Sequence, residues 1–254
     1  MNLSFRKNNN NNRCEEILSR MESMYRAGIE RVKPNYRSYT CVIDAYARSR
    51  EPDASKRAEK ILSRMESIYN SGQLSVRPNV VTYTAVINCI ARSKESRKAF
   101  KAMNVLQRME EQYRLGNESA RPNVLAYNNV LNSAAYTFGD NEEKEEAFKI
   151  ACIIFDEIRT SDYLRLTHVT YGTFLAACGR LMPKGDMRNK LIEATFRRCC
   201  HDGLVSDMVL RQCKKSTNKE MYLRLMSSIK EESQLPRQWT RNVKKREQRA
   251  SIRV

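Results

Sequence analysis

The sequence predicts an all-α protein, an α-solenoid of stacked antiparallel helix pairs. The 254 residues contain only 8 glycines and 6 prolines, whereas average usage is roughly 7% Gly and 5% Pro. This scarcity argues against turn-rich β-sandwiches and Gly-looped nucleotide folds. Hydrophobic residues make up 41% and charged residues 30%, so thin layers of paired helices fit the composition better than a compact globule. The third observation, an internal repeat, decides the fold class.

The repeat has a step of 44 residues. A proline, an asparagine, a methionine and a tyrosine each recur at this step: Pro34, Pro78 and Pro122; Asn35, Asn79 and Asn123; Met21, Met65 and Met109; Tyr39, Tyr83, Tyr127 and Tyr171. Repetition at a fixed period of this size is typical of repeat architectures.

Each repeat predicts two helices. In the middle unit both helices carry an apolar stripe at helical spacing: Tyr83, Val86, Ile87 and Ile90 on the first, Ala102, Leu106 and Met109 on the second. The segment 94–96 links them, and Arg-Pro-Asn ends the second helix, because the residue before a proline is disfavoured in the α region. These stripes are expected to form the core between helices rather than a cofactor site.

A helix pair this narrow cannot bury its apolar face alone, so successive units are expected to stack. The expected organisation is a partial unit 14–35, repeats 36–79, 80–123 and 124–167, a degenerate repeat 168–207, capping helices in 208–235, and two ends, 1–13 and 236–254.

The chain carries 46 Lys and Arg against 29 Asp and Glu, a formal net charge of +17. This excess favours a polyanionic partner, since neutralising phosphates releases counterions; general solubility is the competing explanation. No apolar run approaches the roughly 18 residues that span a bilayer, so no membrane association is expected. The 8 cysteines include no CxxC pair, and we expect reduced thiols, no metal and no cofactor.

The residues resemble the pentatricopeptide repeat family. The resemblance rests on Val-Val-Thr-Tyr-Thr-Ala-Val-Ile-Asn at 80–88, an AxxxLxxM pattern at 102–109 and a closing Arg-Pro-Asn at 121–123. It covers about residues 14–207. The units here are longer than those of the family, and extra residues fall at the interhelix link and after the second helix, at 69–76 and 113–120. The insertions are expected at the edge of the solenoid.

Resemblance to this family implies sequence-dependent binding of single-stranded RNA, one base per repeat. In the family, the residue after the helix-opening tyrosine and the last residue of the repeat read each base. The corresponding pairs are Thr40 with Asn79, Thr84 with Asn123, and Asn128 with Thr167, while the fourth unit offers Gly172 with Asp207. By the family's code, Thr with Asn favours adenine and Asn in the first place favours a pyrimidine. The implied site is A-A-pyrimidine, with a poorly specified fourth base.

Four further residues correspond to the positions that stack on bases in the family: Arg37, Val81, Leu125 and Val169. Arg37 departs from the usual aliphatic residue, although a guanidinium also stacks on a base. The residues alone leave an alternative open, since Thr40, Thr84 and Asn128 are of types that favour helix capping. The same alternative treats Asn79 and Asn123 as turn residues. The resemblance favours base reading.

No catalytic residues are expected. Some members of the family carry a catalytic domain after the repeats, but 208–254 is too short for a nuclease or deaminase core. The strings HxE with PCxxC, GxxxxGK[ST], HExxH and GxSxG do not occur in the sequence. The acidic pairs at 142–146 are expected to begin a solvated helix. Neither a small-molecule substrate nor an enzymatic activity is therefore expected.

The two ends differ from the repeats in composition. Residues 1–13 contain five consecutive asparagines and no acid, which predicts disorder and resembles either a transit-peptide remnant or a frayed terminus. The tail 236–254 begins near Trp239, the only tryptophan, and six of its basic residues are candidates for RNA phosphate contacts: Arg237, Arg241, Lys244, Lys245, Arg246 and Arg249. Trp239 either stacks on RNA or docks on the last helix; both interpretations stand.

The expected function is single-stranded RNA binding in an organelle, mitochondrion or chloroplast, acting in RNA processing, stability or translation. Three or four repeats give modest gross affinity, since stacking contributes roughly 1–3 kcal/mol per base. We therefore expect help from the basic tail, a protein partner or self-association. The alternative is a helical-repeat scaffold that binds proteins, for example within an organellar ribosome.

Overall fold

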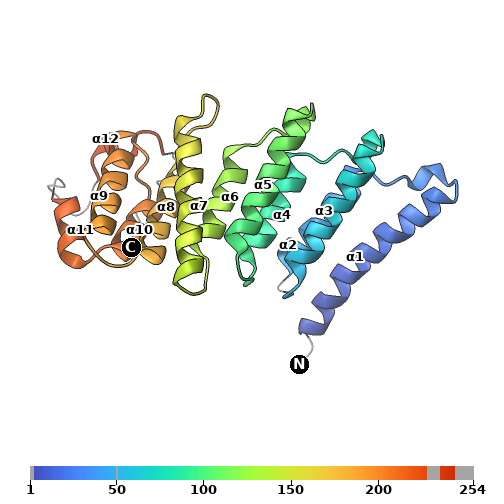
Figure 1. Ribbon diagram of the computed structural model, residues 1–254, viewed down its shortest axis with the longest axis horizontal. Helices are drawn as coiled ribbons and strands as arrows, with labels where there is room; N and C mark the ends of the chain where they lie inside the picture. The colour runs from blue at the N-terminus through green and yellow to red at the C-terminus, as the bar shows by residue number, and fades with distance from the viewer. Residues whose placement is uncertain (1–2, 50, 228–234, 244–254) are drawn as a thin grey trace. The chain divides into compact units, whose positions relative to one another are not determined.

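The computed structural model describes residues 3–49, 51–227 and 235–243 (Figure 1). Within these ranges the chain forms helices and contains no strand. The helices are α1 (Leu3–Arg26), α2 (Tyr36–Arg48), α3 (Ala54–Asn70), α4 (Val80–Arg92), α5 (Lys98–Arg114), α6 (Val124–Ala135), α7 (Asn141–Thr160), α8 (His168–Leu181), α9 (Asp186–His201), α10 (Asp207–Ser216), α11 (Lys219–Met226) and α12 (Arg237–Thr240). The expected all-α class is confirmed.

The chain divides into two compact units, Met1–Ser133 and Ala134–Val254. In the first unit, α2 packs against α1, α3 and α4, and α4 packs in turn against α5. Figure 1 shows α1, α3 and α5 side by side in chain order. Apolar side chains of the predicted stripes fill the layers between them, with Ile43, Met65 and Ile87 all at 0% exposure. The tyrosine and methionine stripes are therefore core.

The residues that lengthen each unit form one repeated structure. Gly28, Gly72 and Gly116 adopt φ values of +91°, +100° and +93° directly after α1, α3 and α5. A left-handed glycine there lets the last turn close with the paired hydrogen bonds of a Schellman motif: the Gly72 N–H donates to the Tyr69 carbonyl, and the next N–H to the Ile68 carbonyl. A short 3₁₀ turn follows each time: η1 (Glu30–Val32), η2 (Leu74–Val76) and η3 (Glu118–Ala120).

The second unit contains the degenerate repeat. Its central helix is α8, which packs against α7, α9 and α10 and is buried from Thr170 to Cys178. Phe155 of α7 stacks on Phe174 of α8 with ring centroids 4.2 Å apart. Helix α7 begins at the acidic segment as expected: Asp140 accepts a hydrogen bond from the Glu143 N–H. Two helices, α10 and α11, lie within 207–226.

The N-terminal segment differs from the expected disorder. Residues 3–13 continue α1 as part of one helix, Leu3–Arg26. The asparagine run contains neither glycine nor proline, and once a helix has nucleated each further residue adds one hydrogen bond. Low helix propensity alone does not stop such propagation. Among the residues described, no helix combines the length and apolar character needed to cross a membrane.

Candidate nucleic-acid interface

The asparagine of each Pro-Asn step caps the helix that follows it. Asn79 has extended backbone angles, φ −131° and ψ 176°. Its Oδ1 accepts hydrogen bonds from the Val81 and Thr82 N–H groups at 3.0 and 3.1 Å and from the Thr82 hydroxyl at 3.1 Å. Asn123 Oδ1 likewise accepts from the Ala126 N–H at 3.0 Å. The cap uses the carbonyl oxygen of each side chain and does not require its amide nitrogen, which is a donor.

The first residue of each expected base-reading pair does not cap a helix. Thr40, Thr84 and Asn128 each lie in the second turn of their helix, so the capping alternative for them is wrong. Their exposures differ. Thr84 is half-buried, whereas Thr40 and Asn128 retain only 9% and 6% of their surface.

Thr40 is held inside the array by two hydrogen bonds. Its hydroxyl donates to the Tyr36 carbonyl at 2.8 Å and lies 2.9 Å from the Thr82 hydroxyl of the next repeat. In contrast, the buried Thr84 Oγ1 has no hydrogen-bond partner among the described residues. An unpaired buried hydroxyl is costly, and because this oxygen is shielded from solvent, other atoms of Thr84 form the surface that it offers to a ligand.

Thr84 and Asn123 line a common groove of about 360 Å³. Two of the expected stacking residues, Val81 and Leu125, line the same groove and are 57% and 56% exposed. The remaining lining residues are Asp44, Val80, Ala85, Asn88 and Asn129. The structure thus brings together, at the junction of two repeats, a threonine, an amide and two exposed aliphatic side chains, which suit the edge and the faces of a planar base.

A second groove, of about 740 Å³, lies at the preceding repeat. Arg37, Asn79 and Val81 line it, but Thr40 does not. Arg37 lies beside Tyr36, with its Cζ 5.7 Å from the ring centroid and its Nε donating to the Tyr36 hydroxyl at 3.1 Å. The first expected pair therefore contributes only its asparagine directly to the groove.

Comparison with known families decides the identity of the repeats. A model described as a pentatricopeptide repeat domain matches residues 69–141, and one described as a PPR repeat matches residues 37–68. The chain is a pentatricopeptide repeat protein. Neither the comparison with curated proteins nor that with solved structures gives a match. All the residues that line the two grooves of this pentatricopeptide repeat protein lie within the matched ranges, except Asn35 and Tyr36.

The degenerate pentatricopeptide unit is built differently. Thr167 caps α8, accepting from the Thr170 N–H at 3.2 Å, and Val169 is half-buried. Gly172, at the place that Thr84 occupies in its own repeat, is buried, and a Cβ added to it would lie 3.2 Å from Met208 Cγ. A larger side chain there would require Met208 to move, so this unit offers no first reader.

The tryptophan of the tail docks on the pentatricopeptide array. Trp239 of α12 is 8% exposed, and its ring meets that of Phe196 edge-on at 5.8 Å. Its carbonyl accepts from the Val205 N–H at 2.8 Å. Burial of a large aromatic side chain is strongly favourable, so the interpretation of Trp239 as a base-stacking residue is wrong. Docking on the array is confirmed, but the helix that Trp239 contacts is α9 rather than the last helix.

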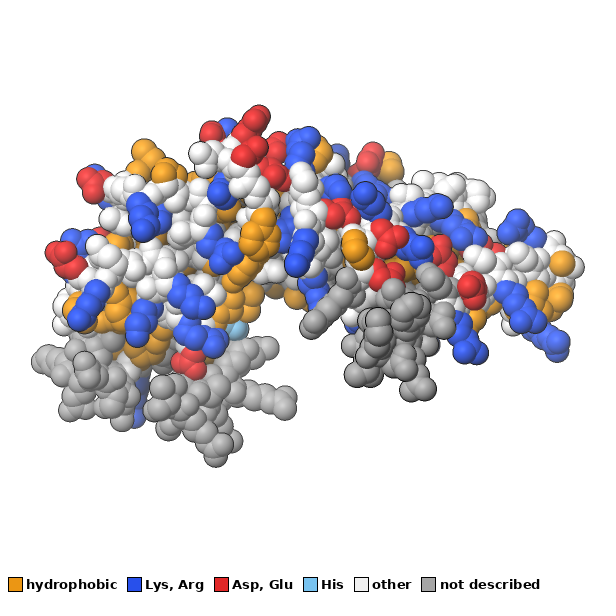
Figure 2. Space-filling model, turned by 90° about the horizontal axis from the view of Figure 1, so that it is seen from below, with side chains coloured by type: hydrophobic (Ala, Val, Ile, Leu, Met, Phe, Trp, Pro, Cys, Tyr) orange, Lys and Arg blue, Asp and Glu red, His pale blue; other side chains and the backbone are white. Residues whose placement is uncertain are grey.

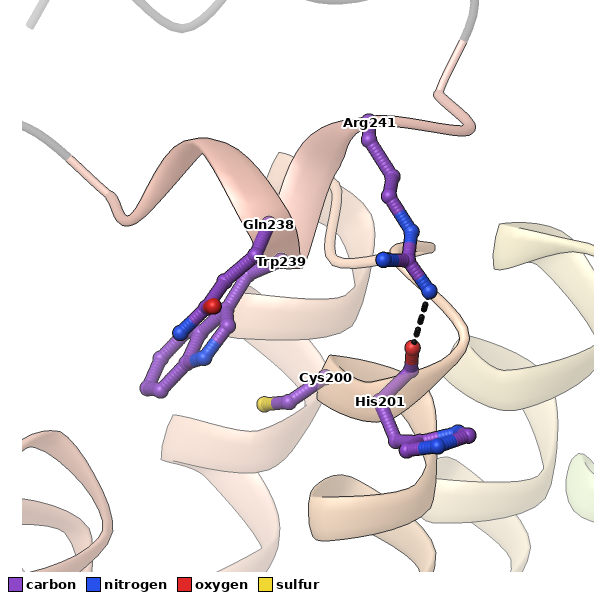
Figure 3. Close-up of a pocket in the computed structure, with 5 residues that line it drawn as sticks. All are labelled: Cys200, His201, Gln238, Trp239 and Arg241. Carbon is purple, nitrogen blue, oxygen red and sulfur yellow. Dashed lines mark hydrogen bonds between the residues drawn. The ribbon is translucent and has the colours of Figure 1, made fainter.

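Of the six candidate phosphate residues, the structure describes two. Arg237 and Arg241 are exposed, and Arg241 donates to the His201 carbonyl at 2.9 Å across a small hollow that Cys200 and Gln238 also line (Figure 3). The other four lie outside the described residues: Lys244, Lys245, Arg246 and Arg249.

Basic side chains are not confined to one patch. On the face shown in Figure 2, Lys and Arg lie among hydrophobic and acidic side chains. Within the described residues, no group of three or more His, Cys, Asp or Glu side chains is placed to hold a metal ion. Burial raises the pKa of the Cys89 and Cys178 thiols to about 12, so both stay protonated at neutral pH and pack as small apolar groups.

Three groove residues were not identified from the sequence. Asp44 and Asn88 occupy equivalent places 44 residues apart, and both line the Thr84 groove together with Asn129. The 44-residue step could have indicated Asp44 and Asn88, because both are polar residues at the same point of successive repeats. Asn129 donates from Nδ2 to the Thr84 carbonyl at 3.5 Å, a contact between repeats that no local pattern encodes.

Proposed function

We propose that this pentatricopeptide repeat protein binds single-stranded RNA in a sequence-dependent manner and acts in organellar RNA processing, stability or translation. The repeats act as binding modules and carry no catalytic step. Single-stranded RNA is the natural ligand, because its unstacked bases expose both a flat face and a hydrogen-bonding edge.

The observation that carries the proposal is the Thr84–Asn123 groove. Val81 and Leu125 are more than half exposed although they are aliphatic, and a base inserted between them would remove that surface from water. The same insertion would bring a base edge to the exposed Asn123 side chain and next to Thr84, whose buried and unpaired hydroxyl would have to turn toward the groove to meet it. The arrangement therefore offers burial and hydrogen bonding to one planar polar ligand.

The proposed base order follows from the family's code. Thr40 with Asn79 and Thr84 with Asn123 each favour adenine, and Asn128 with Thr167 favours a pyrimidine, which gives A-A-pyrimidine. In the first repeat the Thr82 hydroxyl lies between the Thr40 hydroxyl and the Asn79 Oδ1, and its single proton can be donated to only one of them. We expect this indirect pair to discriminate less sharply than the second pair, in which Thr84 itself lines the groove.

The short array requires additional affinity. Stacking gives roughly 1–3 kcal/mol per base, so we propose that basic side chains of the tail, Arg237 and those between 244 and 254, add phosphate contacts. Deleting 244–254, which leaves Trp239 in place, should weaken binding to all RNAs alike and flatten the salt dependence. Unchanged affinity after this deletion would leave a protein partner or self-association as the source of additional affinity.

A selection from random RNA tests the proposal. The full chain should enrich oligonucleotides with adjacent adenines followed by a pyrimidine. If the selected pool binds without any base preference, and this affinity falls with rising salt, the result would contradict sequence-dependent binding. That outcome would favour the scaffold alternative, in which the repeats bind proteins and charge alone attracts RNA. Isolation of the protein from cells, with sequencing of bound RNA and mass spectrometry of bound protein, then identifies the transcript and compartment.

A further inference from the structure

A basic residue lies at the same point of each repeat, directly after the inserted turn. It stands directly before the Pro-Asn step, as Lys33, Arg77 and Arg121, at intervals of 44 residues. A residue that only closes a turn need not be basic, so the charge in all three repeats requires a separate explanation.

Each of these cations lies over a tyrosine ring. The distance from the cation to the ring centroid is 5.2 Å for Lys33 over Tyr25, 5.8 Å for Arg77 over Tyr69 and 5.8 Å for Arg121 over Tyr113. The tyrosine belongs in each case to the helix that ends before the turn. A ring face attracts the cation without cancelling its charge, so the contact orients the group while its charge remains.

Arg77 lines the larger groove, the one that also contains Asn79 and Arg37. The ten residues lining this groove include two arginines and no acidic residue: Asn35, Tyr36, Arg37, Leu74, Ser75, Arg77, Asn79, Val80, Val81 and Ser119. Within the described part of the chain, no ion pair joins Arg37 or Arg77 to a carboxylate. The groove therefore combines positive charge with an absence of lining acids.

This groove adjoins the Thr84–Asn123 groove, because Val80 and Val81 line both. A strand with one base between Val81 and Leu125 would place its neighbouring nucleotide on the other side of Val81, next to Arg77. The backbone that joins the two nucleotides carries one negative charge per phosphate. Anionic ligands of other kinds would meet the positive charge but would make no use of the adjoining base groove.

We propose that Arg77, with its equivalents Lys33 and Arg121, binds the phosphodiester backbone of the RNA strand whose bases enter the two grooves. The inference rests on the proposed function and adds to it a non-specific row of contacts supplied by the residues that precede the Pro-Asn steps. Arg77 and Arg121 directly follow the inserted segments 69–76 and 113–120 and belong to the Arg-Pro-Asn steps themselves. Base choice stays with the Thr and Asn side chains, and these basic residues contribute affinity alone.

Salt dependence separates this role from base reading. The full chain and its variants are titrated with a fluorescent single-stranded RNA containing A-A-pyrimidine over a series of KCl concentrations. For single strands, log K falls with log salt by about 0.7 for each phosphate contact. The double variant Arg77→Gln, Arg121→Gln should flatten the slope by about twice that amount and leave the A-over-G preference unchanged. Arg77→Lys with Arg121→Lys should restore most of the slope.

The chain offers a matched control within the same two repeats, 36–79 and 80–123. Arg48 and Arg92 are exposed, are 44 residues apart and end α2 and α4. The variant Arg48→Gln, Arg92→Gln removes the same charge in the same two-repeat pattern. An equal change of the salt slope in both double variants, or no change in the Arg77/Arg121 variant, would overturn the proposal that Arg77 and its equivalents bind the RNA backbone.

The outcomes distinguish the two proposals. Base preference in the wild-type chain, with an unchanged salt slope in the Arg77/Arg121 variant, would refute phosphate binding by these residues and leave the proposed function intact. A flattened slope in that variant, without base preference in the wild type, would support the row and refute sequence reading. Failure of the wild-type chain to bind any RNA would overturn both. Helical circular dichroism of each variant verifies that the chain is folded.

Discussion

The Tyr83 hydroxyl donates a 2.7 Å hydrogen bond to the Glu66 carboxylate, which joins α3 to α4. Arg108 of α5 pairs with the same carboxylate, so one acid receives donors from the next two helices. Glu22 repeats the arrangement with Tyr39 and Arg64. Burial, and then the adjacent Glu66 charge, raise the pKa of Tyr83, which keeps the hydroxyl protonated as a donor.

Substitution of Tyr83 by Phe tests this link. The change removes one donor from a carboxylate that is only 15% exposed, and a hydrogen bond to a charged group is worth about 1.5–3 kcal/mol. We expect the free energy of unfolding in urea to fall by about that amount. Tyr69→Phe is the control, because no hydroxyl hydrogen bond is described for Tyr69, and an equal loss there would rule out the link as the cause.

Stability should fall at alkaline pH. Burial raises the pKa of Tyr39 to about 12, above its ordinary value of 10.0. As the pH rises, the unfolded chain releases the Tyr39 phenol proton before the folded chain does. The contribution of this phenol to the free energy of unfolding is therefore complete below pH 10 and is lost as the pH rises toward 12. The free energy of unfolding, measured with urea from pH 8 to 11.5, should decline above pH 10. Tyr39→Phe should reduce the slope of this free energy against pH by at most about 1.4 kcal/mol per pH unit. A slope unchanged by this substitution would be inconsistent with the buried phenol.

The glycine of the inserted turn should resist substitution. Gly72 has φ +100°, and a left-handed conformation costs an L-residue roughly 1–2 kcal/mol. Gly72→Ala should therefore destabilise the chain by about this amount although no atom lies within 4 Å of the added Cβ. Gly185→Ala is the control, since its site is equally open but its backbone is extended at φ 160°. Calorimetry showing equal midpoints for the two variants would contradict the role of the turn.

Trp239 should matter for stability and not for RNA. It is 8% exposed against Phe196, and truncation of a buried aromatic residue costs about 3–5 kcal/mol. Trp239→Ala should lower stability in urea to that extent, while RNA affinity corrected for the folded fraction stays within twofold of wild type, about 0.4 kcal/mol. A tenfold loss of affinity at unchanged stability would reinstate the stacking role.

The sequence predicts the array well because the signals that begin and end its helices are local. Asn35 and Asn79 cap α2 and α4 where the Pro-Asn step places them, and the apolar stripes around Ile43 and Ile87 become core. The three equally spaced glycines, Gly28, Gly72 and Gly116, carry the signal for the inserted turns, but the turn itself depends on backbone hydrogen bonds that residue types do not specify.

The candidate site is predicted only in part, because burial within it depends on contacts between repeats. Thr40 and Thr84 occupy equivalent positions, yet Thr40 pairs with Thr82 while the Thr84 hydroxyl stays unpaired at its groove. Residue types also do not show that Arg77 and Asn79 share a groove, or that Trp239 folds back onto Phe196. Such contacts join residues that the repeat pattern treats separately.

Base preference is the central claim, and substitution of the two capping asparagines tests it most directly. Asp caps a helix as well as Asn does, so Asn79→Asp with Asn123→Asp should keep the fold and replace an amide donor by an acceptor. Asn218→Asp, which alters the cap of α11, is the control. Affinities for RNAs that differ only in the two purines should favour A in the wild type and the control, and shift toward G in the double variant. Equal affinities for A and G in the wild type, or no shift in the double variant, would contradict the account.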